Sequence, residues 1–258
     1  MPIPGQAAST TPLLHGMTAL VTGASSGLGR HFVGVLAAHG AQVIGAARRT
    51  DALEEVIAPL RAAGAAARAV ALDVREPSSV EAAMRDCGAL DIVVNNAGVT
   101  HTRPAMDVGD DDWQAVIDTN LSGAFRVATS AARVMSAGGR PGVIVNIASV
   151  LGFRVAKQIP AYVAAKAGLV RLTEALALEW AAQRIRVNAL APGYVETELN
   201  RDFLRSDAGT AIARRIPQRR FGQPADLDGA LLLLAGPAGN YITGTTIVVD
   251  GGHTLAWL

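Results

Sequence analysis

The chain has 258 residues, of which half are apolar and 17% are charged, and its formal net charge is +1 at pH 7. A chain so close to neutral lacks the basic excess of nucleic-acid-binding proteins. No apolar run approaches the ~20 residues of a membrane span, and no signal-peptide pattern opens the sequence. Cys87 is the only cysteine, so an intrachain disulfide is excluded. We therefore expect a soluble, cytoplasmic protein of one domain.

Short apolar, β-prone runs alternate along the chain with helical patterns. This alternation predicts an α/β fold, in which a parallel sheet is covered by helices on both faces. Strands are expected near 17–22, 41–47, 66–72, 91–95, 142–148, 185–190 and 245–249. Helices are expected near 27–39, 51–63, 77–86, 110–137, 160–183 and 224–235. Residues 1–15 are expected to form a mobile extension, and residues 16–258 the domain itself.

A glycine-rich turn, Gly23-Ala24-Ser25-Ser26-Gly27-Leu28-Gly29, follows the first expected strand, and a helical pattern begins behind it. Strand, turn and helix in this order are the context that a dinucleotide-binding loop requires. Glycines let the backbone approach a pyrophosphate, and the helix N-terminus supplies free N–H groups. The spacing is Gly-x-x-x-Gly-x-Gly rather than the commoner Gly-x-Gly-x-x-Gly, and an ordinary strand–helix connection also fits it.

Tyr162 and Lys166 lie four residues apart in an expected helix, and Ser149 lies thirteen residues before the tyrosine. Positions i and i+4 share a helix face, so the ammonium can approach the phenol. A phenol titrates near pH ~10, and a nearby positive charge favours its ionised form, which suits proton exchange with a substrate oxygen. An amphipathic helix with an interfacial tyrosine and a solvated lysine would produce the same pattern.

Taken together, these residues and further motifs resemble the short-chain dehydrogenase/reductase family in its single-domain form, from about Gly16 to Gly252. The resemblance implies a Rossmann fold with a seven-stranded parallel sheet and a substrate lid near 194–222. It implies a catalytic tetrad of Asn120, Ser149, Tyr162 and Lys166. The cofactor-binding residues that it implies are Gly23, Ser25, Ser26, Gly27, Leu28, Gly29, Asp73, Val74, Asn96, Ala97, Gly98, Tyr162, Lys166, Pro192, Gly193, Val195 and Thr197.

The activity implied by the resemblance is reversible hydride transfer between a nicotinamide cofactor and a carbonyl/secondary-alcohol pair. Ser149 would donate a hydrogen bond to the substrate oxygen, and Tyr162 would deliver or remove the proton. Lys166 would lower the pKa of the tyrosine and hold the nicotinamide ribose. Asn120 would hold a water molecule that links the lysine to solvent.

The end of the second expected strand bears on the choice of cofactor. An NAD-preferring relative carries an acidic residue there for the ribose 2′-hydroxyl, whereas this chain has Ala47 followed by Arg48 and Arg49. A guanidinium can bind a 2′-phosphate through two hydrogen bonds. We therefore expect NADP(H) rather than NAD(H), with Arg48 and Arg49 in the cofactor site, although a solvated loop would also account for Arg48.

The substrate site is expected to be largely apolar, because few charges lie in the segments that should line it. Its predicted substrate-binding residues are Ser149, Leu151, Phe153, Ile159, Tyr162 and Tyr194, with Val150 and Val99-Thr100-His101 nearby. This lining favours the reduction of a neutral, hydrophobic ketone. A 3-oxoacyl-carrier-protein reductase and an NAD-dependent secondary-alcohol dehydrogenase are the alternatives. A cofactor sensor without turnover is disfavoured, because such relatives typically lose the tyrosine or the lysine.

The resemblance also implies a homotetramer with dihedral symmetry. One interface would pair the helices near 110–137 and 160–183, and the other would pair the last helix and the last strand. Leu231-Leu232-Leu233-Leu234 is apolar around a whole helical turn, and Leu255-Ala256-Trp257-Leu258 is too apolar for a free tail. Packing inside one subunit would also explain both segments. No metal site, nucleic-acid partner or membrane partner is expected.

Overall fold

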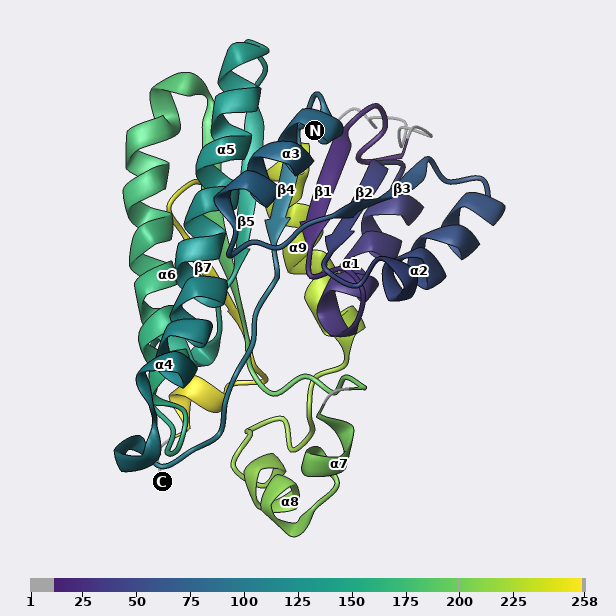
Figure 1. Cartoon of the computed structure of the whole chain (residues 1–258). Helices are drawn as coiled ribbons and strands as arrows, with labels where there is room; N and C mark the ends of the chain where they lie inside the picture. The colour runs from purple at the N-terminus through teal and green to yellow at the C-terminus, as the bar shows by residue number, and fades with distance from the viewer. Residues whose placement is uncertain (1–11, 199, 257–258) are drawn as a thin grey trace, which may run out of the picture.

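A seven-stranded parallel sheet lies at the centre of the protein, in the strand order β3-β2-β1-β4-β5-β6-β7 (Figure 1). The computed structural model describes residues 12–198 and 200–256. The strands are β1 (Thr18–Thr22), β2 (Gln42–Ala47), β3 (Ala67–Ala71), β4 (Ile92–Asn95), β5 (Gly142–Ile147), β6 (Ile185–Pro192) and β7 (Thr246–Val249). All seven coincide with the strands expected from the sequence, because strands buried on both faces read as nearly continuous apolar runs. The predicted Rossmann fold is confirmed.

Helices cover both faces of this sheet. They are α1 (Gly27–Ala38), α2 (Thr50–Ala62), α3 (Pro77–Cys87), α4 (Asp110–Ile117), α5 (Gly123–Ala137), α6 (Pro160–Trp180), α7 (Arg201–Leu204), α8 (Asp207–Ala213) and α9 (Asp228–Ala235). One core cluster joins α1, α2 and α9 to the sheet, and a second joins α3, α5 and α6 to its other face. Along the described residues, no helix has both the length and the apolar character needed to cross a membrane.

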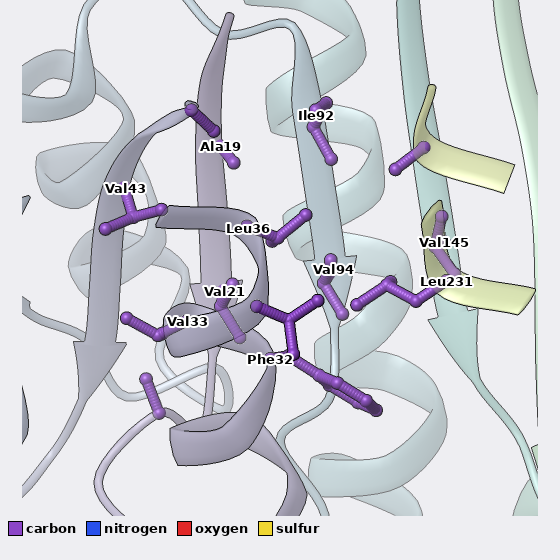
Figure 2. Close-up of a cluster of buried hydrophobic side chains, with 14 of the residues drawn as sticks. Ala19, Val21, Phe32, Val33, Leu36, Val43, Ile92, Val94, Val145 and Leu231 are labelled. Atoms are coloured by element: carbon purple, nitrogen blue, oxygen red, sulfur yellow. The ribbon is translucent and has the colours of Figure 1, made fainter. Parts of the chain in front are cut away.

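Figure 2 shows how the first of these core clusters is assembled. Phe32 and Leu36 of α1 lie over Val21 and Val94, which belong to the two central strands, and all four side chains are fully buried. Leu231 of α9 closes the cluster beside β5. The helix that follows the glycine-rich turn is thereby fixed to the strand that precedes it.

The region expected as one helix over 110–137 is interrupted. A π-helical turn, Asp118–Ser122, separates α4 from α5. Such turns insert one extra residue into a helix and are frequent at functional sites. One inserted residue is too short a break in the apolar periodicity to divide the predicted helix. The helices expected over 160–183 and 224–235 are also subdivided, since their ends, Ala181–Gln183 and Pro224–Leu227, are 3₁₀-helical.

The C-terminal part of the expected extension, residues 12–15, packs against the domain. Residues 12–15 form a turn in which the backbone N–H of Leu14 donates to the carbonyl of His39 at 2.9 Å, and the Leu14 side chain is fully buried. Pro12 packs against Gly40, which has φ +90° and leaves no room for a Cβ atom. These contacts tie the segment to the end of α1. Residues 1–11 lie outside the described part of the chain.

The segment expected as a lid, 194–222, contains the short helices α7 and α8, which the sequence analysis did not predict. Figure 1 shows both helices below the carboxyl ends of the strands, set apart from the layers of the sheet. The two ends of the segment are joined, since Gly222 N donates to the Tyr194 carbonyl at 2.9 Å and Glu196 N donates to the Gly222 carbonyl at 2.8 Å. The segment therefore leaves and re-enters the domain at one place.

Candidate active site

The strand order reverses direction between β1 and β4, and the carboxyl ends of these two strands therefore mark the expected ligand site. From β1 the chain continues outward through β2 and β3, and it then returns to place β4 on the other side of β1. Connections on the two sides of this switch point diverge, and in open α/β sheets ligands bind there. The glycine-rich turn after β1 and the Asn96-Ala97-Gly98 segment after β4 flank this expected site.

The glycine-rich turn has the backbone geometry of a phosphate-binding loop. Gly23 and Gly27 have φ of +66° and +55°, a region that favours glycine. A Cβ atom on Gly29 would lie 2.3 Å from the Gly23 carbonyl oxygen, so only glycine fits in this first turn of α1. The Ser26 side chain makes no capping hydrogen bond to the helix. The first N–H groups of α1 therefore lack a side-chain cap and fit an anionic group such as a pyrophosphate.

Thr22 and Asn96 hold this turn in place. The Thr22 hydroxyl oxygen accepts from the backbone N–H groups of Asn96 and Ala97, both at 3.0 Å. The Asn96 amide donates to the carbonyls of Thr22 at 2.9 Å and Gly23 at 3.3 Å. The side chain of Asn96, predicted to bind cofactor, is thus engaged beneath the loop. Thr22 was missed by the sequence analysis, although its position as the last residue of β1 was a usable signal.

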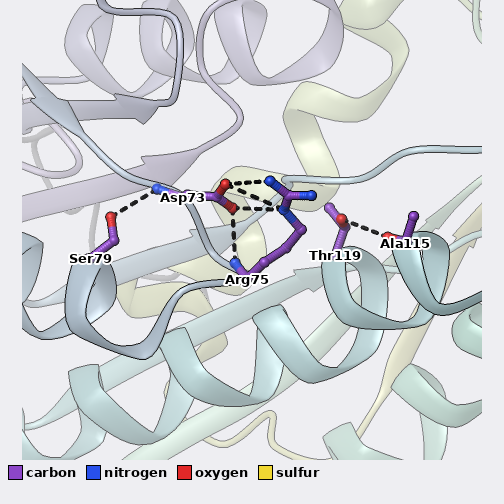
Figure 3. Close-up of polar contacts among 5 residues, drawn as sticks. All are labelled: Asp73, Arg75, Ser79, Ala115 and Thr119. Atoms are coloured by element: carbon purple, nitrogen blue, oxygen red, sulfur yellow. Dashed lines mark hydrogen bonds and ion pairs between the residues drawn. The ribbon is translucent and has the colours of Figure 1, made fainter. Parts of the chain in front are cut away.

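A cluster of charges lies at the carboxyl ends of β2 and β3. Arg48 and Arg49 are both exposed, and Arg49 Nη2 lies 3.4 Å from the Ser25 hydroxyl in the glycine-rich turn. Asp73 is bound by Arg75, whose Nη2 donates to Asp73 Oδ2 at 2.7 Å and whose Nε donates to Oδ1 at 3.1 Å (Figure 3). These hydrogen bonds hold the pKa of Asp73 below its usual value. Arg75 was not predicted from the sequence.

Asn120 lies at the centre of the π-helical turn and is 1% exposed. Its Oδ1 accepts from Val99 N at 2.8 Å, and its Nδ2 donates to the Val99 carbonyl at 2.8 Å. Val74 packs against the start of α5 directly after this turn, since a Cβ atom on Gly123 would lie 2.7 Å from Val74 Cγ2. The amide of Asn120 therefore fastens the turn to the loop after β4, and Val74 supports it from the loop after β3.

Ser149 and Tyr162 are brought together from different elements. Ser149 follows β5, is 8% exposed and accepts a hydrogen bond from Leu151 N at 3.1 Å. Tyr162 lies in the first turn of α6. Burial raises the pKa of Tyr162, and its hydrogen bond with Ser149 opposes this rise in part. The two hydroxyl groups can therefore meet one substrate oxygen.

Lys166 lies one turn farther along α6 and is buried. Its Nζ donates to the Ile147 carbonyl at 2.6 Å and lies 5.6 Å from the centre of the Tyr162 ring. Burial lowers the pKa of Lys166 to about 8. The expected lowering of the tyrosine pKa by this ammonium is not observed, because burial dominates and the net shift of the Tyr162 pKa is upward. The sequence places the two groups on one face but does not reveal that Lys166 is buried and Tyr162 partly buried.

A chain of buried polar side chains supports α6 below these residues. Asn95 Nδ2 donates to Asn146 Oδ1 at 2.9 Å, and Asn146 Nδ2 donates to the Thr173 hydroxyl oxygen at 2.9 Å. Thr173 in turn donates to the Leu169 carbonyl at 2.8 Å. These bonds connect β4, β5 and α6, and buried polar networks of this kind favour one defined arrangement of the elements they join.

The predicted nicotinamide loop begins where β6 ends. Gly193 N donates to the Val249 carbonyl at 2.9 Å, and a Cβ atom on Gly193 would lie 2.7 Å from Asp250 Cβ. Thr197 N donates to Asn200 Oδ1 at 2.8 Å. Pro192 and Val195 are buried, so of this group Thr197 keeps a partly accessible side chain at the entrance of the lid.

The predicted substrate-lining residues differ in accessibility. Leu151 and Ile159 are partly accessible, and Phe153 is 50% exposed. Val150 is 4% exposed, so its side chain belongs to the interior and not to the lining. His101 is exposed and lies 3.2 Å from Asp112 through its Nδ1 atom, so this ring nitrogen faces the carboxylate.

Residues 23–254 match the protein family described as enoyl-(acyl carrier protein) reductase. The chain belongs to the short-chain dehydrogenase/reductase family. It is 38% identical over 243 residues to 3-oxoacyl-(acyl-carrier-protein) reductase of Vibrio harveyi, and the aligned region covers 93% of this chain and 98% of the relative. It is 37% identical over 247 residues to 2-dehydro-3-deoxy-D-gluconate 5-dehydrogenase of Escherichia coli strain K12, and the aligned region covers 93% of this chain and 96% of that relative.

Solved structures of this family agree with the fold and with the class of cofactor. The gluconate 5-dehydrogenase from Burkholderia cenocepacia J2315, in complex with NADP and tartrate, is 38% identical and superposes with a TM-score of 0.91 over 95% of this chain and 97% of that chain. A short-chain dehydrogenase/reductase from Mycobacterium marinum is 38% identical, with a TM-score of 0.89 over 93% and 96%. This short-chain dehydrogenase/reductase is thus an NAD(P)-dependent oxidoreductase of carbonyl/alcohol pairs.

Proposed function

We propose that the enzyme transfers hydride between NADP(H) and a ketone/secondary-alcohol pair, and that it mainly reduces hydrophobic ketones. The observation that carries this proposal is the approach of Ser149 and Tyr162 at the carboxyl end of β5, with Lys166 one helical turn away. When bound, the nicotinamide supplies or accepts the hydride. The protein then has to orient the substrate and move one proton.

In the direction of reduction, Tyr162 donates its hydroxyl proton to the carbonyl oxygen as the hydride reaches the carbonyl carbon. Ser149 donates a hydrogen bond to the same oxygen and stabilises the developing negative charge. Since burial raises the pKa of Tyr162, the phenol holds its proton until the substrate oxygen becomes basic. Oxidation of the alcohol reverses each step, and Tyr162 then accepts the proton.

Lys166 has a second task in this proposal. An ammonium has three N–H donors, and one of them is used by the Ile147 carbonyl. The remaining donors would hold the hydroxyl groups of the nicotinamide ribose, and the positive charge would favour ionised Tyr162 during oxidation. Both polar atoms of the Asn120 amide are bonded to the Val99 backbone. We therefore assign to Asn120 the role of stabilising the π-helical turn, and protons would reach Lys166 along this turn.

The preference for NADP(H) is inferred from the end of β2. Ala47 supplies no carboxylate that would repel a 2′-phosphate, and the exposed Arg48 and Arg49 follow it. The position of Arg49 beside Ser25 connects these arginines to the phosphate-binding turn. Steady-state kinetics with a panel of ketones should give a higher kcat/KM with NADPH than with NADH. A clear preference for NADH would overturn this assignment.

Reduction of a 3-oxoacyl group on a carrier protein is the second candidate, favoured by the relative from Vibrio harveyi. Assaying a 3-oxoacyl carrier protein beside free ketones of the same acyl length separates the two possibilities. A kcat/KM that is at least tenfold higher for the carrier-bound substrate would favour the second candidate. The secondary alcohols that correspond to these free ketones, assayed with NAD in the oxidative direction, test a secondary-alcohol dehydrogenase.

We further propose a homotetramer. A hollow between α5 and α6 is bordered by Leu121, Leu172 and Phe125, the last of which is 46% exposed. On the second proposed surface, β7 forms one edge of the sheet and Leu233 of α9 is 37% exposed. Burial of these faces by other subunits would remove apolar surface from water. Light scattering at micromolar concentration should give four times the subunit mass, and a monomeric mass would refute the proposal.

A further inference from the structure

The segment that follows β7 lies between two parts of the protein that were predicted to bind substrate. On one side the Arg154 side chain, from the loop after Ser149, donates a hydrogen bond to the Thr254 carbonyl. On the other side the ring of His253 lies 5.7 Å from the ring of Tyr194, at the start of the lid. Gln218 N also donates to the Gly251 carbonyl at 3.2 Å. This segment therefore forms a wall between the Ser149 loop and the lid.

The position of His253 is fixed by the backbone around it. Gly251 and Gly252 have φ of +63° and +86°, and these values let the chain reverse directly after β7. The Asp250 carboxylate accepts from Gly252 N at 2.8 Å and from Thr254 N at 2.7 Å. Both carboxylate oxygens are thus engaged by the turn itself. His253 is held on a rigid turn rather than on a free tail.

The hydrogen bonding of His253 differs from that of three other histidines. His31, His39 and His101 each place a ring nitrogen within hydrogen-bond distance of an oxygen atom. Across the described residues, the ring nitrogens of His253 make no such contact, although the side chain is only partly exposed. Because a neutral or protonated imidazole carries at least one N–H donor, His253 keeps a donor that none of the described residues accepts from.

We propose that His253 is a specificity-determining residue, which donates a hydrogen bond to an oxygen acceptor on the substrate, remote from the carbonyl group that is reduced. The inference rests on the ketone reduction proposed above and adds a polar end to the substrate. The apolar lining contributed by Leu151 and Ile159 would hold the carbon chain, and His253 would select ketones that end in a carboxylate or a hydroxyl group. Hydrogen bonds to buried or partly buried polar groups discriminate more strongly than apolar contacts do.

Ketones of equal length with different ends test this inference. The substrates are 5-oxohexanoate, 6-hydroxy-2-hexanone and 2-hexanone, together with their five-carbon counterparts, each reduced with NADPH. His253→Phe keeps an aromatic ring against Tyr194 and removes both ring nitrogens, whereas His253→Gln keeps a donor. His15→Phe makes the same replacement at an exposed position in the turn before β1 and serves as the control.

We expect the wild type to prefer at least one oxygen-bearing series over the hydrocarbon ketones. In His253→Phe, kcat/KM for that series should fall roughly 10- to 100-fold, mainly through KM, while 2-hexanone is reduced as before. His253→Gln should recover part of the loss, and His15→Phe should match the wild type. Whether the carboxylate or the hydroxyl series responds identifies the acceptor.

Equal changes for all three substrates in His253→Phe would overturn the inference while leaving the proposed ketone reduction intact. If His253→Phe does not fold, the wild-type comparison still decides, because a wild type that shows no preference for an oxygen-bearing ketone refutes a polar site at His253. A wild type that reduces none of the ketones refutes the proposed function itself, and the inference falls with it.

Discussion

Two glycine-to-alanine substitutions in α1 should have opposite effects. A Cβ atom on Gly29 would lie 2.3 Å from the Gly23 carbonyl oxygen and 2.5 Å from Asn96 Nδ2, about 1 Å short of van der Waals separation. Gly34 lies in the same helix, and a Cβ atom there would meet no atom within 4 Å outside the neighbouring helix backbone. Gly29→Ala therefore tests the close approach of the phosphate-binding turn, and Gly34→Ala is its matched control.

The structure gives the expected magnitudes. Overpacking at Gly29 costs about 1–3 kcal/mol, and the displaced Asn96 amide loses two hydrogen bonds that are each worth about 1 kcal/mol. For a chain of this size, 1 kcal/mol corresponds to roughly 2–4 °C in Tm, so a total of about 3–5 kcal/mol should make Gly29→Ala melt roughly 6–20 °C below the wild type. Gly34→Ala should gain about 0.5–1 kcal/mol from helix propensity and melt slightly higher.

Thermal unfolding and titration with NADPH, followed by its fluorescence, measure both effects. Since the displaced carbonyl belongs to the turn that would hold the pyrophosphate, Gly29→Ala should bind NADPH at least tenfold more weakly, and Gly34→Ala should bind it as the wild type does. A Gly29→Ala enzyme with wild-type Tm and NADPH affinity would refute the proposed fit between the turn, Asn96 and the cofactor.

Three further predictions concern the proton donor, the lysine and the choice of cofactor. Tyr162→Phe should lower kcat by about 10²–10⁴-fold and leave NADPH binding intact, and a variant that retained a tenth of the wild-type rate would exclude the acid role. Because burial lowers the Lys166 pKa to about 8, the ammonium is lost as pH rises through this value, and NADPH affinity should weaken there. This pH dependence should be absent from Lys166→Met and retained in Lys157→Met, which alters the only other lysine; an unchanged profile in Lys166→Met would contradict the assignment. Ala47→Asp should weaken NADPH binding roughly 10- to 100-fold by placing a carboxylate beside the 2′-phosphate, and relative use of NADH should improve; unchanged discrimination would place phosphate recognition elsewhere.

The sequence predicts the sheet well because buried parallel strands such as β4 and β5 are short apolar runs with turns at both ends. It does not predict the π-helical turn at Asn120, which depends on Val99 and Val74, two residues from distant loops. The helices α7 and α8 were missed because four and seven residues are too few for a clear periodicity.

Among the candidate site residues, spacing was informative for Tyr162 and Lys166 because one helix carries both. Their burial could not be read in this way, so the upward shift that burial gives the Tyr162 pKa was not predicted. Arg75 and His253 escaped notice for a related reason. Arg75 acquires its importance by folding back on Asp73, and His253 by meeting Tyr194, a residue 59 positions earlier in the chain.

The paired ends of the lid make this segment an exchangeable module. Between Tyr194 and Gly222 the chain departs from the domain and returns to the same place, and within this excursion Glu198 and Gln218 make single contacts with Arg30 and Gly251 of the domain. Insertions or replacements within such a closed excursion change the entropy of loop closure only slowly with length. Natural variation can therefore change the residues of the lid that would contact the substrate, while the residues proposed for hydride transfer remain unchanged.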